Sequence, residues 1–494
     1  MKLTSIAPRA AFIALLMSPA SAFAVCSSNQ VEDSFTAVEC DNGFDPIGVQ
    51  AKQGVTHVSV VVRNDGGIES SATAINLNGD SVIEISGLVS SGSGSGIFLS
   101  GSGSQQVLVN GFAEVLARNY GIYASGGQFN TEGNINITNF GLLSGPLNNG
   151  GIFASGNRTS LVQNFGEIAV AGTGYGINLS GSAGADLLSV LNRGSILAGG
   201  YGIRVHGLNA LRIDNSAAID SGGYGLEARY GNDIEIINGG NLRLRGSSGY
   251  GIYADNSDGL RQEDVAVSVT NSGDILMESA TVQPRGIVAY SSSGVNQNGE
   301  RFRGDVNLVN SGAITGLSAS STGIEAVASH DAIIENDGII NVAGAGIRVT
   351  GSLAELTNRA AITAGLGITM TGADSVGQQG RTILRNSGDI LASSFIGVEL
   401  FGRSIELTNT GDVTSQQRNA IDILGRSDKG QAVAVDVFNS GRLVSPQANT
   451  IEVVASNFGG SVARASVINE GELVAGGGGI NVQAEVDPKI WTRR

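Results

Sequence analysis

Asp389 and Asp412 come closest in this sequence to a pair of chemically active residues. Each follows an asparagine by three positions, and the two lie 23 residues apart. If they occupy neighbouring units of a repeat, the carboxylates stack about 5 Å apart and could hold a cation or share a proton. The next two copies of the pattern place Arg442 and Glu472 at this position, and the alternation of charge offsets the repulsion between the stacked carboxylates. We therefore interpret the series as a solvated charge ladder, and predict no catalytic residues, no metal site and no cofactor.

The asparagines before these aspartates belong to a long series. Fourteen asparagines each have Ile, Leu or Val four residues later and an apolar residue two positions earlier, and glycine stands two residues after twelve of them. They are Asn64, Asn139, Asn164, Asn192, Asn215, Asn238, Asn271, Asn310, Asn336, Asn358, Asn386, Asn409, Asn439 and Asn469. Asn followed by x-Gly fits a sharp corner, because both residues accept left-handed backbone conformations.

The segments that lead into these corners alternate apolar and polar residues, as in Ile234-Glu235-Ile236, which is the period of a strand with one buried face. A second signature, Gly followed by Ile, Leu or Val, falls between most corners and starts another short strand. Corner-to-corner spacings of 22 to 39 residues suit three strands and three turns and leave no room for helices. We predict an all-β, right-handed parallel β-helix of roughly seventeen coils, in which equivalent asparagines stack.

Composition agrees with a chain that buries a core and does not bind nucleic acid. Glycine is abundant (74 of 494 residues), proline is scarce (7), and 41% of the residues are hydrophobic, so the chain is neither collagen-like nor disordered. The net charge is −15 with 29 Lys and Arg residues. Binding to DNA or RNA needs clustered positive charge, so we exclude both as partners.

Four segments are expected along the chain. Residues 1–24 match a signal peptide, with a charged start, an apolar run and an Ala-Phe-Ala end, so we predict export. Residues 25–56 lack the repeat and are assigned to an N-terminal cap, in which Cys26 and Cys40 form a disulfide in the oxidising compartment. The β-helix covers residues 57–486, and residues 487–494 form an uncapped tail.

The signal, the N-x-G-x-[ILV] coils, the few cysteines and the acidic balance together resemble the passenger region of Gram-negative autotransporters, the pertactin-like adhesins. The resemblance covers about residues 57–486. It implies a stalk displayed at the cell surface by a C-terminal outer-membrane barrel in the same polypeptide. The sequence lacks the alternating ten-residue strands of such a barrel, so we expect a passenger without its barrel.

The resemblance favours adhesion without catalysis, with a host-cell receptor, a matrix protein or a surface polysaccharide as partner. Parallel β-helices also carry polysaccharide lyases and hydrolases, so such an enzyme is the first alternative. Three or more convergent carboxylates on adjacent coils would favour it, and the sequence indicates at most two. The second alternative is a truncated remnant without function.

Two groups of residues remain as candidate binding sites. Arg303-Gly304-Asp305 is a tripeptide with which adhesins engage integrins, and it ends the longest predicted loop. Four tyrosines precede a glycine at the same bend on successive repeats and could stack sugars or stabilise the turn: Tyr175, Tyr201, Tyr224 and Tyr250. The three histidines, His57, His206 and His330, recur at no common position, and the sequence suggests no second ligand beside them.

Overall fold

The computed structural model describes residues 26–126, 133–156, 158–181, 185–246, 249–257, 264–278, 283–292, 302–373, 380–427, 431–458 and 462–486. Within these ranges all regular structure is β-strand, and none of it is a helix that could cross a membrane. The all-β parallel β-helix is confirmed. The expected signal peptide and the tail at 487–494 lie outside the described residues.

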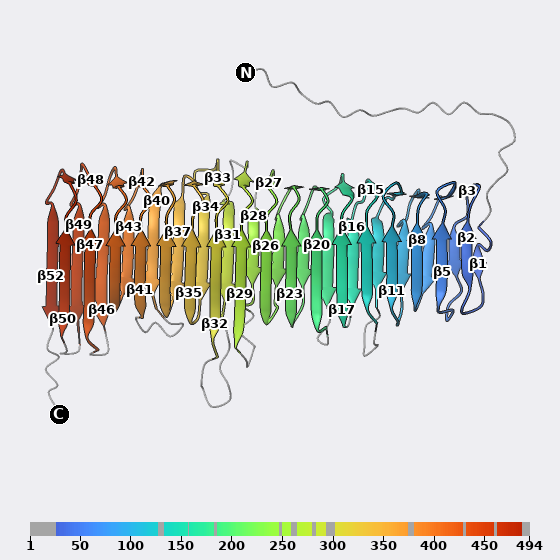
Figure 1. Ribbon diagram of the computed structural model, residues 1–494, viewed down its shortest axis with the longest axis horizontal. Coiled ribbons are helices and arrows are strands. Elements are labelled where there is room, and N and C mark those ends of the chain that lie inside the picture. The colour runs from blue at the N-terminus through green and yellow to red at the C-terminus, as the bar shows by residue number, and fades with distance from the viewer. Residues whose placement is uncertain are drawn as a thin grey trace, which may run out of the picture.

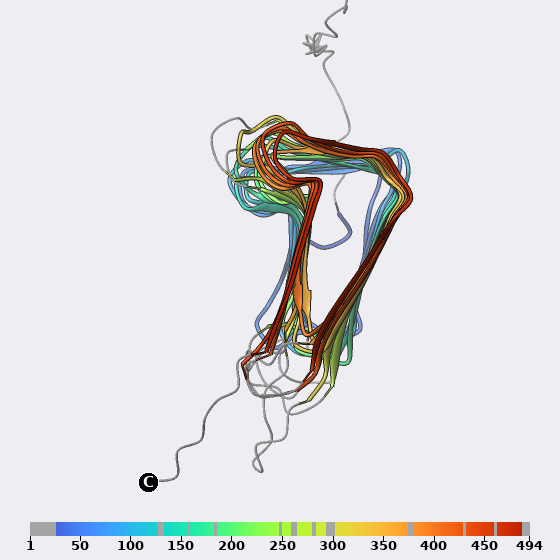
Figure 2. The same ribbon diagram turned by 90° about the vertical axis from the view of Figure 1, so that its left-hand side faces the viewer.

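The strands form three parallel sheets that wind into one rod (Figure 1). Each coil runs through a strand of sheet B, then sheet C, then sheet A, and each strand pairs with the strand three places further along the chain. Sheets B and C contain 17 described strands each and sheet A contains 18. Seen along the rod, sheets A and B form the long sides and sheet C a short side, and the chain bulges outward between sheets C and A (Figure 2).

Sheet A consists of β1 Gln30–Val31, β4 Val49–Ala51, β7 Ile75–Asn78, β10 Ile97–Ser100, β13 Tyr120–Ser125, β16 Gly150–Gly156, β19 Tyr175–Gly181, β22 Ile203–His206, β25 Leu226–Arg229, β28 Tyr250–Asp255, β31 Arg285–Ser291, β34 Thr322–Ala328, β37 Ala345–Gly351, β40 Leu366–Gly372, β43 Val398–Gly402, β46 Ile421–Ser427, β49 Ile451–Asn457 and β52 Ile480–Val486. Sheet B consists of β2 Ala37–Cys40, β5 Val58–Val62, β8 Ser81–Ile85, β11 Gln105–Val109, β14 Ile135–Asn139, β17 Thr159–Asn164, β20 Leu187–Asn192, β23 Ala210–Asn215, β26 Asp233–Asn238, β29 Val265–Asn271, β32 Gly304–Asn310, β35 Asp331–Asn336, β38 Leu353–Asn358, β41 Arg381–Asn386, β44 Ser404–Asn409, β47 Val433–Asn439 and β50 Ala463–Asn469. Sheet C consists of β3 Gly43–Asp45, β6 Gly66–Ser70, β9 Leu88–Ser91, β12 Glu114–Leu116, β15 Leu142–Gly145, β18 Glu167–Val170, β21 Ile196–Ala198, β24 Ile219–Ser221, β27 Leu242–Leu244, β30 Ile275–Met277, β33 Ile314–Gly316, β36 Ile340–Asn341, β39 Ile362–Ala364, β42 Ile390–Ala392, β45 Val413–Ser415, β48 Leu443–Ser445 and β51 Leu473–Ala475.

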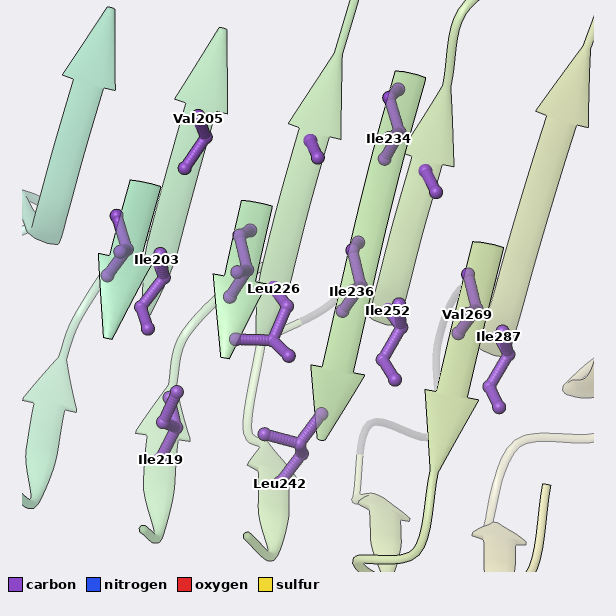
Figure 3. Close-up of a cluster of buried hydrophobic side chains, with 14 of the residues drawn as sticks. Ile203, Val205, Ile219, Leu226, Ile234, Ile236, Leu242, Ile252, Val269 and Ile287 are labelled. Atoms are coloured by element: carbon purple, nitrogen blue, oxygen red, sulfur yellow. The ribbon is translucent and has the colours of Figure 1, made fainter. Parts of the chain in front are cut away.

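The core is a set of apolar columns that run along the rod. Ile203, Leu226, Ile252 and Ile287 are register partners on consecutive strands of sheet A, and all are fully buried. They face the inward side chains of sheet B, such as Ile236 (Figure 3). Burying each such side chain contributes about 1.5–3 kcal/mol, so the alternating pattern of every coil adds to one continuous core.

The corner between sheets B and C is stabilised by a ladder of buried asparagines. Each asparagine from Asn139 to Asn439 donates from Nδ2 to Oδ1 of the asparagine on the next coil, over 2.6–2.8 Å, so the predicted stacking is confirmed. The same Nδ2 also donates to a carbonyl two residues further on, as from Asn310 to Gly312. Asn64 is not part of this column, because the strand register places Val62 there, and Asn64 is exposed.

The corner glycines are needed for a different reason from the one predicted. The left-handed conformation expected there is absent from Gly166 and Gly194, whose φ angles lie outside the left-handed range. Instead the backbones of successive coils nearly touch, and a Cβ on Gly194 would lie 1.8 Å from the carbonyl oxygen of Gly166. A side chain at this position would push neighbouring coils apart.

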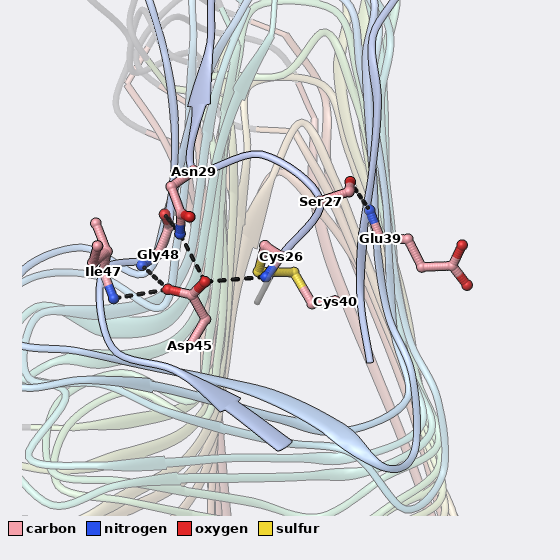
Figure 4. The surroundings of a disulfide bond; sticks show 8 residues. All are labelled: Cys26, Ser27, Asn29, Glu39, Cys40, Asp45, Ile47 and Gly48. Carbon is pink, nitrogen blue, oxygen red and sulfur yellow. Dashed lines mark hydrogen bonds between the residues drawn. A yellow bond between two sulfur atoms is a disulfide. The ribbon is translucent and has the colours of Figure 1, made fainter. Parts of the chain in front are cut away.

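The segment assigned to the N-terminal cap is built as a further coil. Strands β2, β3 and β4 pair in register with β5, β6 and β7. Cys26 is joined to Cys40 by a disulfide with an S–S distance of 2.05 Å, and Ser27 hydrogen-bonds the free edge of β2 at Glu39 (Figure 4). The cap therefore covers the first edge with its own preceding residues.

Buried Asp45 holds this end together. Its carboxylate accepts hydrogen bonds from the backbone N–H groups of Cys26, Ile47 and Gly48 and from the side chain of Asn29. Burial raises the pKa of Asp45, but the four hydrogen bonds outweigh it, so the pKa lies below its ordinary value.

Candidate functional site

Asp389 and Asp412 act as backbone acceptors between coils. Oδ1 of Asp389 accepts the N–H of Asp412 at 3.1 Å, and Oδ1 of Asp412 accepts the N–H of Arg442 at 2.9 Å. Arg442 in turn pairs with Glu472 at 3.0 Å. Each side chain is therefore directed to the next coil, and both aspartates are exposed. This geometry favours the charge-ladder interpretation of these residues.

The four tyrosines stack into a column at the start of sheet A. Ring centroids are 5.1 Å apart between Tyr175 and Tyr201, 4.7 Å between Tyr201 and Tyr224, and 4.8 Å between Tyr224 and Tyr250. The Arg204 guanidinium lies over the first two rings. Burial raises the pKa of Tyr224 to about 12, with further contributions from the neighbouring tyrosines. Because the ring faces cover one another, this column favours stabilisation of the turn over sugar stacking.

Beside the column, sheet A carries an outward-facing charge network around Glu227. This carboxylate is 1% exposed and lies 2.9 Å from Arg204 Nε, 3.5 Å from His206 Nε2 and 3.6 Å from an Arg229 nitrogen. The arginines also lie over aromatic rings, Arg229 over Tyr253 among them. Cations on several sides compensate the buried carboxylate, so the network stabilises the face on which it lies.

The tyrosine column ends at Tyr250, and a pocket of about 490 Å³ opens immediately beyond it. The register places Arg285, Thr322, Ala345 and Leu366 on the next four coils at the tyrosine position, where Thr322 and Ala345 are smaller than a tyrosine and leave space. The pocket is lined by these residues and by others of the bulge between sheets C and A. A cavity of this size is in the range of small-ligand sites.

Polar groups and one exposed ring surround this pocket. Arg348, exposed at its edge, has no ion pair within the described part of the chain, although its charge acts on Glu399. Arg285 pairs with Glu325 at 2.7 Å. Phe395 on the opposite side is 55% exposed. Hydrogen-bond donors, nearby acceptors and a free aromatic ring are the groups that bind the hydroxyls and faces of a sugar.

Three carboxylates follow on the next coils, in one column of sheet A. Glu399, Asp422 and Glu452 are register partners on β43, β46 and β49. The side-chain nitrogen of Asn419 donates to both Asp422, at 3.3 Å, and Glu452, at 2.8 Å, so these two carboxylates converge on one amide.

The pKa values of two of these carboxyls are shifted upward. Burial raises the pKa of Asp422, the charges of Glu452 and Glu399 raise it further, and the Asn419 hydrogen bond only partly offsets them. Burial also raises the pKa of Glu399, against a hydrogen bond from Thr369 and the charge of Arg348. A partly buried carboxyl beside other carboxylates can keep its proton closer to neutral pH, as a general acid requires.

The sequence did not predict this acidic column, because the Gly-Ile signature that identifies the strands of sheet A ends before the column does. The Gly-Ile signature is last seen at Gly397-Val398, and on the next two coils Ala420 and Thr450 replace the glycine. Each of these two coils nevertheless has an apolar residue followed by an acid, Ile421-Asp422 in the first and Ile451-Glu452 in the second. Aligning the strands by the apolar residue would have detected three stacked acids.

The Arg303-Gly304-Asp305 tripeptide lies mainly within a strand. Gly304 and Asp305 begin β32, and Asp305 pairs with Ala266 of the preceding coil. Most of the expected loop before it, residues 293–301, lies outside the described residues. The Asp305 carboxylate contacts His330 Nδ1 at 2.7 Å. The tripeptide is therefore held by its neighbours on adjoining coils.

The histidines do have acidic neighbours. His57 lies 3.3 Å from Asp80, His206 is part of the Glu227 network, and His330 is 3.2 Å from Asp331 as well as bonded to Asp305. The expectation that no second ligand lies beside a histidine is therefore wrong for His330. Asp331 is its neighbour in sequence, and Asp305 is brought to it by the stacking of coils.

Comparisons of the chain with models of protein families, with curated proteins and with solved structures found no match. The fold and its surfaces are therefore the basis of the functional argument.

Proposed function

We propose that this protein is an exported β-helical stalk of the autotransporter passenger type, which functions in adhesion at or near the cell surface and catalyses no reaction. The observation that carries the proposal is the uninterrupted stacking of strands from β1 to β52, which makes an extended rod with long lateral surfaces. Repeat rods of this kind present such surfaces to large partners. Host-cell receptors, matrix proteins and surface polysaccharides are the partners that we propose.

Within this rod, the outer face of sheet A is the binding surface that we favour. It carries the pocket beside Arg348 and Phe395, where both a charged donor and an aromatic ring are exposed. Exposed arginines and aromatics supply much of the binding energy at interfaces. A polysaccharide chain could follow the face along the rod, because equivalent positions recur with every coil.

The test of adhesion is saturable binding of the purified protein to immobilised polysaccharides, matrix proteins and cultured cells. We expect binding to at least one surface, reduced about tenfold or more by Arg348→Gln combined with Phe395→Ala. The matched control is Arg359→Gln with Phe140→Ala, which alters an exposed arginine and an exposed ring near the B–C corner. If the protein binds none of these surfaces saturably, adhesion is contradicted. If the control variant loses as much binding as the pocket variant, the pocket is excluded as the binding site.

Export is tested separately by fractionating cells that express the whole chain. We expect the protein in the outer-membrane or extracellular fraction, with a new N-terminus at Val25 after cleavage of residues 1–24. Full-length protein with an intact Met1 in the cytoplasm would contradict the proposal.

A polysaccharide-cleaving enzyme is the second candidate, favoured by the column of Glu399, Asp422 and Glu452. Paired carboxyls with one pKa raised suit general acid–base cleavage of a glycosidic bond. Its test is release of reducing ends or of unsaturated sugars from a panel of polysaccharides. Turnover that is abolished by Asp422→Asn and kept by Asp412→Asn would favour the enzyme over the stalk, and no turnover on any substrate would count against it.

A further inference from the structure

We infer that Asp305, His330 and Asp331 form a binding site for a divalent metal ion of borderline softness, with Zn²⁺ as the best-fitting ion. His330 Nδ1 lies 2.7 Å from Asp305 Oδ1 and 3.2 Å from Asp331 Oδ1. One ligand atom from each of the three side chains lies within 4.8 Å of the other two. This site is independent of the pocket and of the acidic column on sheet A.

The cluster differs from the charge ladders elsewhere on the rod. Carboxylates on the outer face of sheet B generally pair with arginines of adjacent coils, as Glu235 does with Arg212 and Glu406 with Arg381. Asp305 and Asp331 form no ion pair with an arginine in the described ranges, and the side chain that contacts both of them is His330. Two carboxylates and one imidazole on adjoining coils therefore converge on one place, where a dication would bridge them.

Strands on both sides hold the backbone that carries these side chains in place. The backbone N–H of His330 donates to the carbonyl of Gly304 at 3.0 Å, and the N–H of Leu353 on the next coil donates to the carbonyl of His330 at 3.3 Å. Oδ1 of Asp305 also accepts the N–H of Asp331 at 3.1 Å, which fixes its orientation. Ligands carried by such a paired framework need little rearrangement to bind an ion.

The donor set indicates which ion fits. One imidazole nitrogen and two carboxylate oxygens are ligands of Zn²⁺, at about 2.0–2.2 Å each, with water completing a tetrahedron. The present separations of 2.7 and 3.2 Å need to widen only slightly around such an ion. Ca²⁺ takes six to eight oxygen ligands, and Mg²⁺ requires an octahedron of oxygens, so both are poorer fits.

The test is calorimetric titration of the untagged mature chain with Zn²⁺ at pH 7.5, with Ca²⁺ and Mg²⁺ as comparisons. We expect one high-affinity equivalent of Zn²⁺, and binding at least about tenfold weaker in Asp305→Asn, His330→Gln and Asp331→Asn, since each removes a ligand. Zn²⁺ should also raise the unfolding temperature of the wild type and leave that of the variants unchanged.

His57→Gln is the matched control, because His57 also lies beside an aspartate, Asp80, at 3.3 Å but has no second carboxylate within reach among the described residues. This variant should bind Zn²⁺ as the wild type does. The inference is overturned if the wild type takes up no Zn²⁺ at low micromolar concentration, if the His330 variant binds equally well, or if the His57 variant loses the same equivalent.

Discussion

At the residue scale, the buried asparagines of the B–C corner do more than shape a turn. Asn310 accepts from Asn271 and donates to Asn336, with 2.7 and 2.8 Å between the atoms, and it is fully buried. Asn310→Ala leaves a donor and an acceptor of its two neighbours unpaired inside the rod. We expect the free energy of unfolding to fall by roughly 2–4 kcal/mol, measured by denaturant titration followed by circular dichroism.

Asn64→Ala is the control for this substitution. Asn64 carries the same sequence signature but lies outside the ladder and is exposed, so its replacement should change stability by less than about 0.5 kcal/mol. Equal destabilisation by the two substitutions would show that the sequence signature, and not the buried ladder, determines the effect.

Asp45 gives the N-terminal end a dependence on pH. Its pKa is lowered in the folded chain, so the unfolded carboxyl binds a proton at a higher pH than the folded one. The stabilisation by Asp45 is therefore fully present above about pH 4, the ordinary value for an aspartate, and is lost as the pH falls through the lower folded pKa. In Asp45→Asn the charge is absent, and this contribution should disappear.

Hydrogen exchange of residues 26–51, compared between wild type and Asp45→Asn at each pH from 2.5 to 6, measures this dependence. We expect the largest difference in protection above about pH 4, and convergence of the two proteins as the pH falls further, through the lower folded pKa of Asp45. A difference that stays constant down to pH 2.5 would show that the Asp45 charge does not stabilise this end.

At the scale of the strands and turns, the sequence predicted the columns whose residue type recurs on many coils and missed those whose residue types change from coil to coil. The B–C corner has an asparagine, a glycine and two apolar residues at fixed spacings, so its strands and ladder could be predicted. The outward positions of sheet A carry no residue type that recurs on every coil. Glu399, Asp422 and Glu452 become neighbours only through register, and so do Asp305 and His330.

Substituting glycines at the corners tests how closely the coils stack. A Cβ on Gly194 would lie 1.8 Å from a backbone oxygen of the preceding coil, whereas a Cβ on Gly111 would meet nothing within 4 Å. Gly194→Ala should lower the free energy of unfolding by at least about 1–3 kcal/mol, because two packed backbones must move apart. Gly111→Ala should leave stability unchanged or raise it by about 0.5 kcal/mol, since it restricts the unfolded chain.

Denaturant titration of both variants checks this pair. Similar stabilities of the two variants would mean that the corner tolerates a side chain, and that close stacking is not what requires glycine.

At the scale of the whole molecule, the rod is a one-dimensional assembly in which each coil contacts mainly its two neighbours. Stability is then approximately a sum over coils and interfaces, and function can be confined to a few of them. The proposed metal site spans two coils, whereas the pocket and the acidic column occupy successive stretches of sheet A. Such a scaffold lets surface residues change along one face without altering the core.

This architecture predicts that whole coils can be removed but fractions of a coil cannot. Deleting residues 336–408 joins Glu335 to Asn409, so that Asn409 takes the position of Asn336 in the ladder and Val413 that of Ile340 in the core. The three sheets keep their register, and the rod should fold about 14 Å shorter, at about 4.8 Å per coil.

Deleting residues 336–398 instead joins a strand of sheet B directly to one of sheet A, which shifts every later residue off its column. Small-angle scattering for length and circular dichroism for β-structure distinguish the two: we expect a folded, shortened rod only from the first deletion. Folding of both, or of neither, would contradict a rod in which coils are interchangeable units.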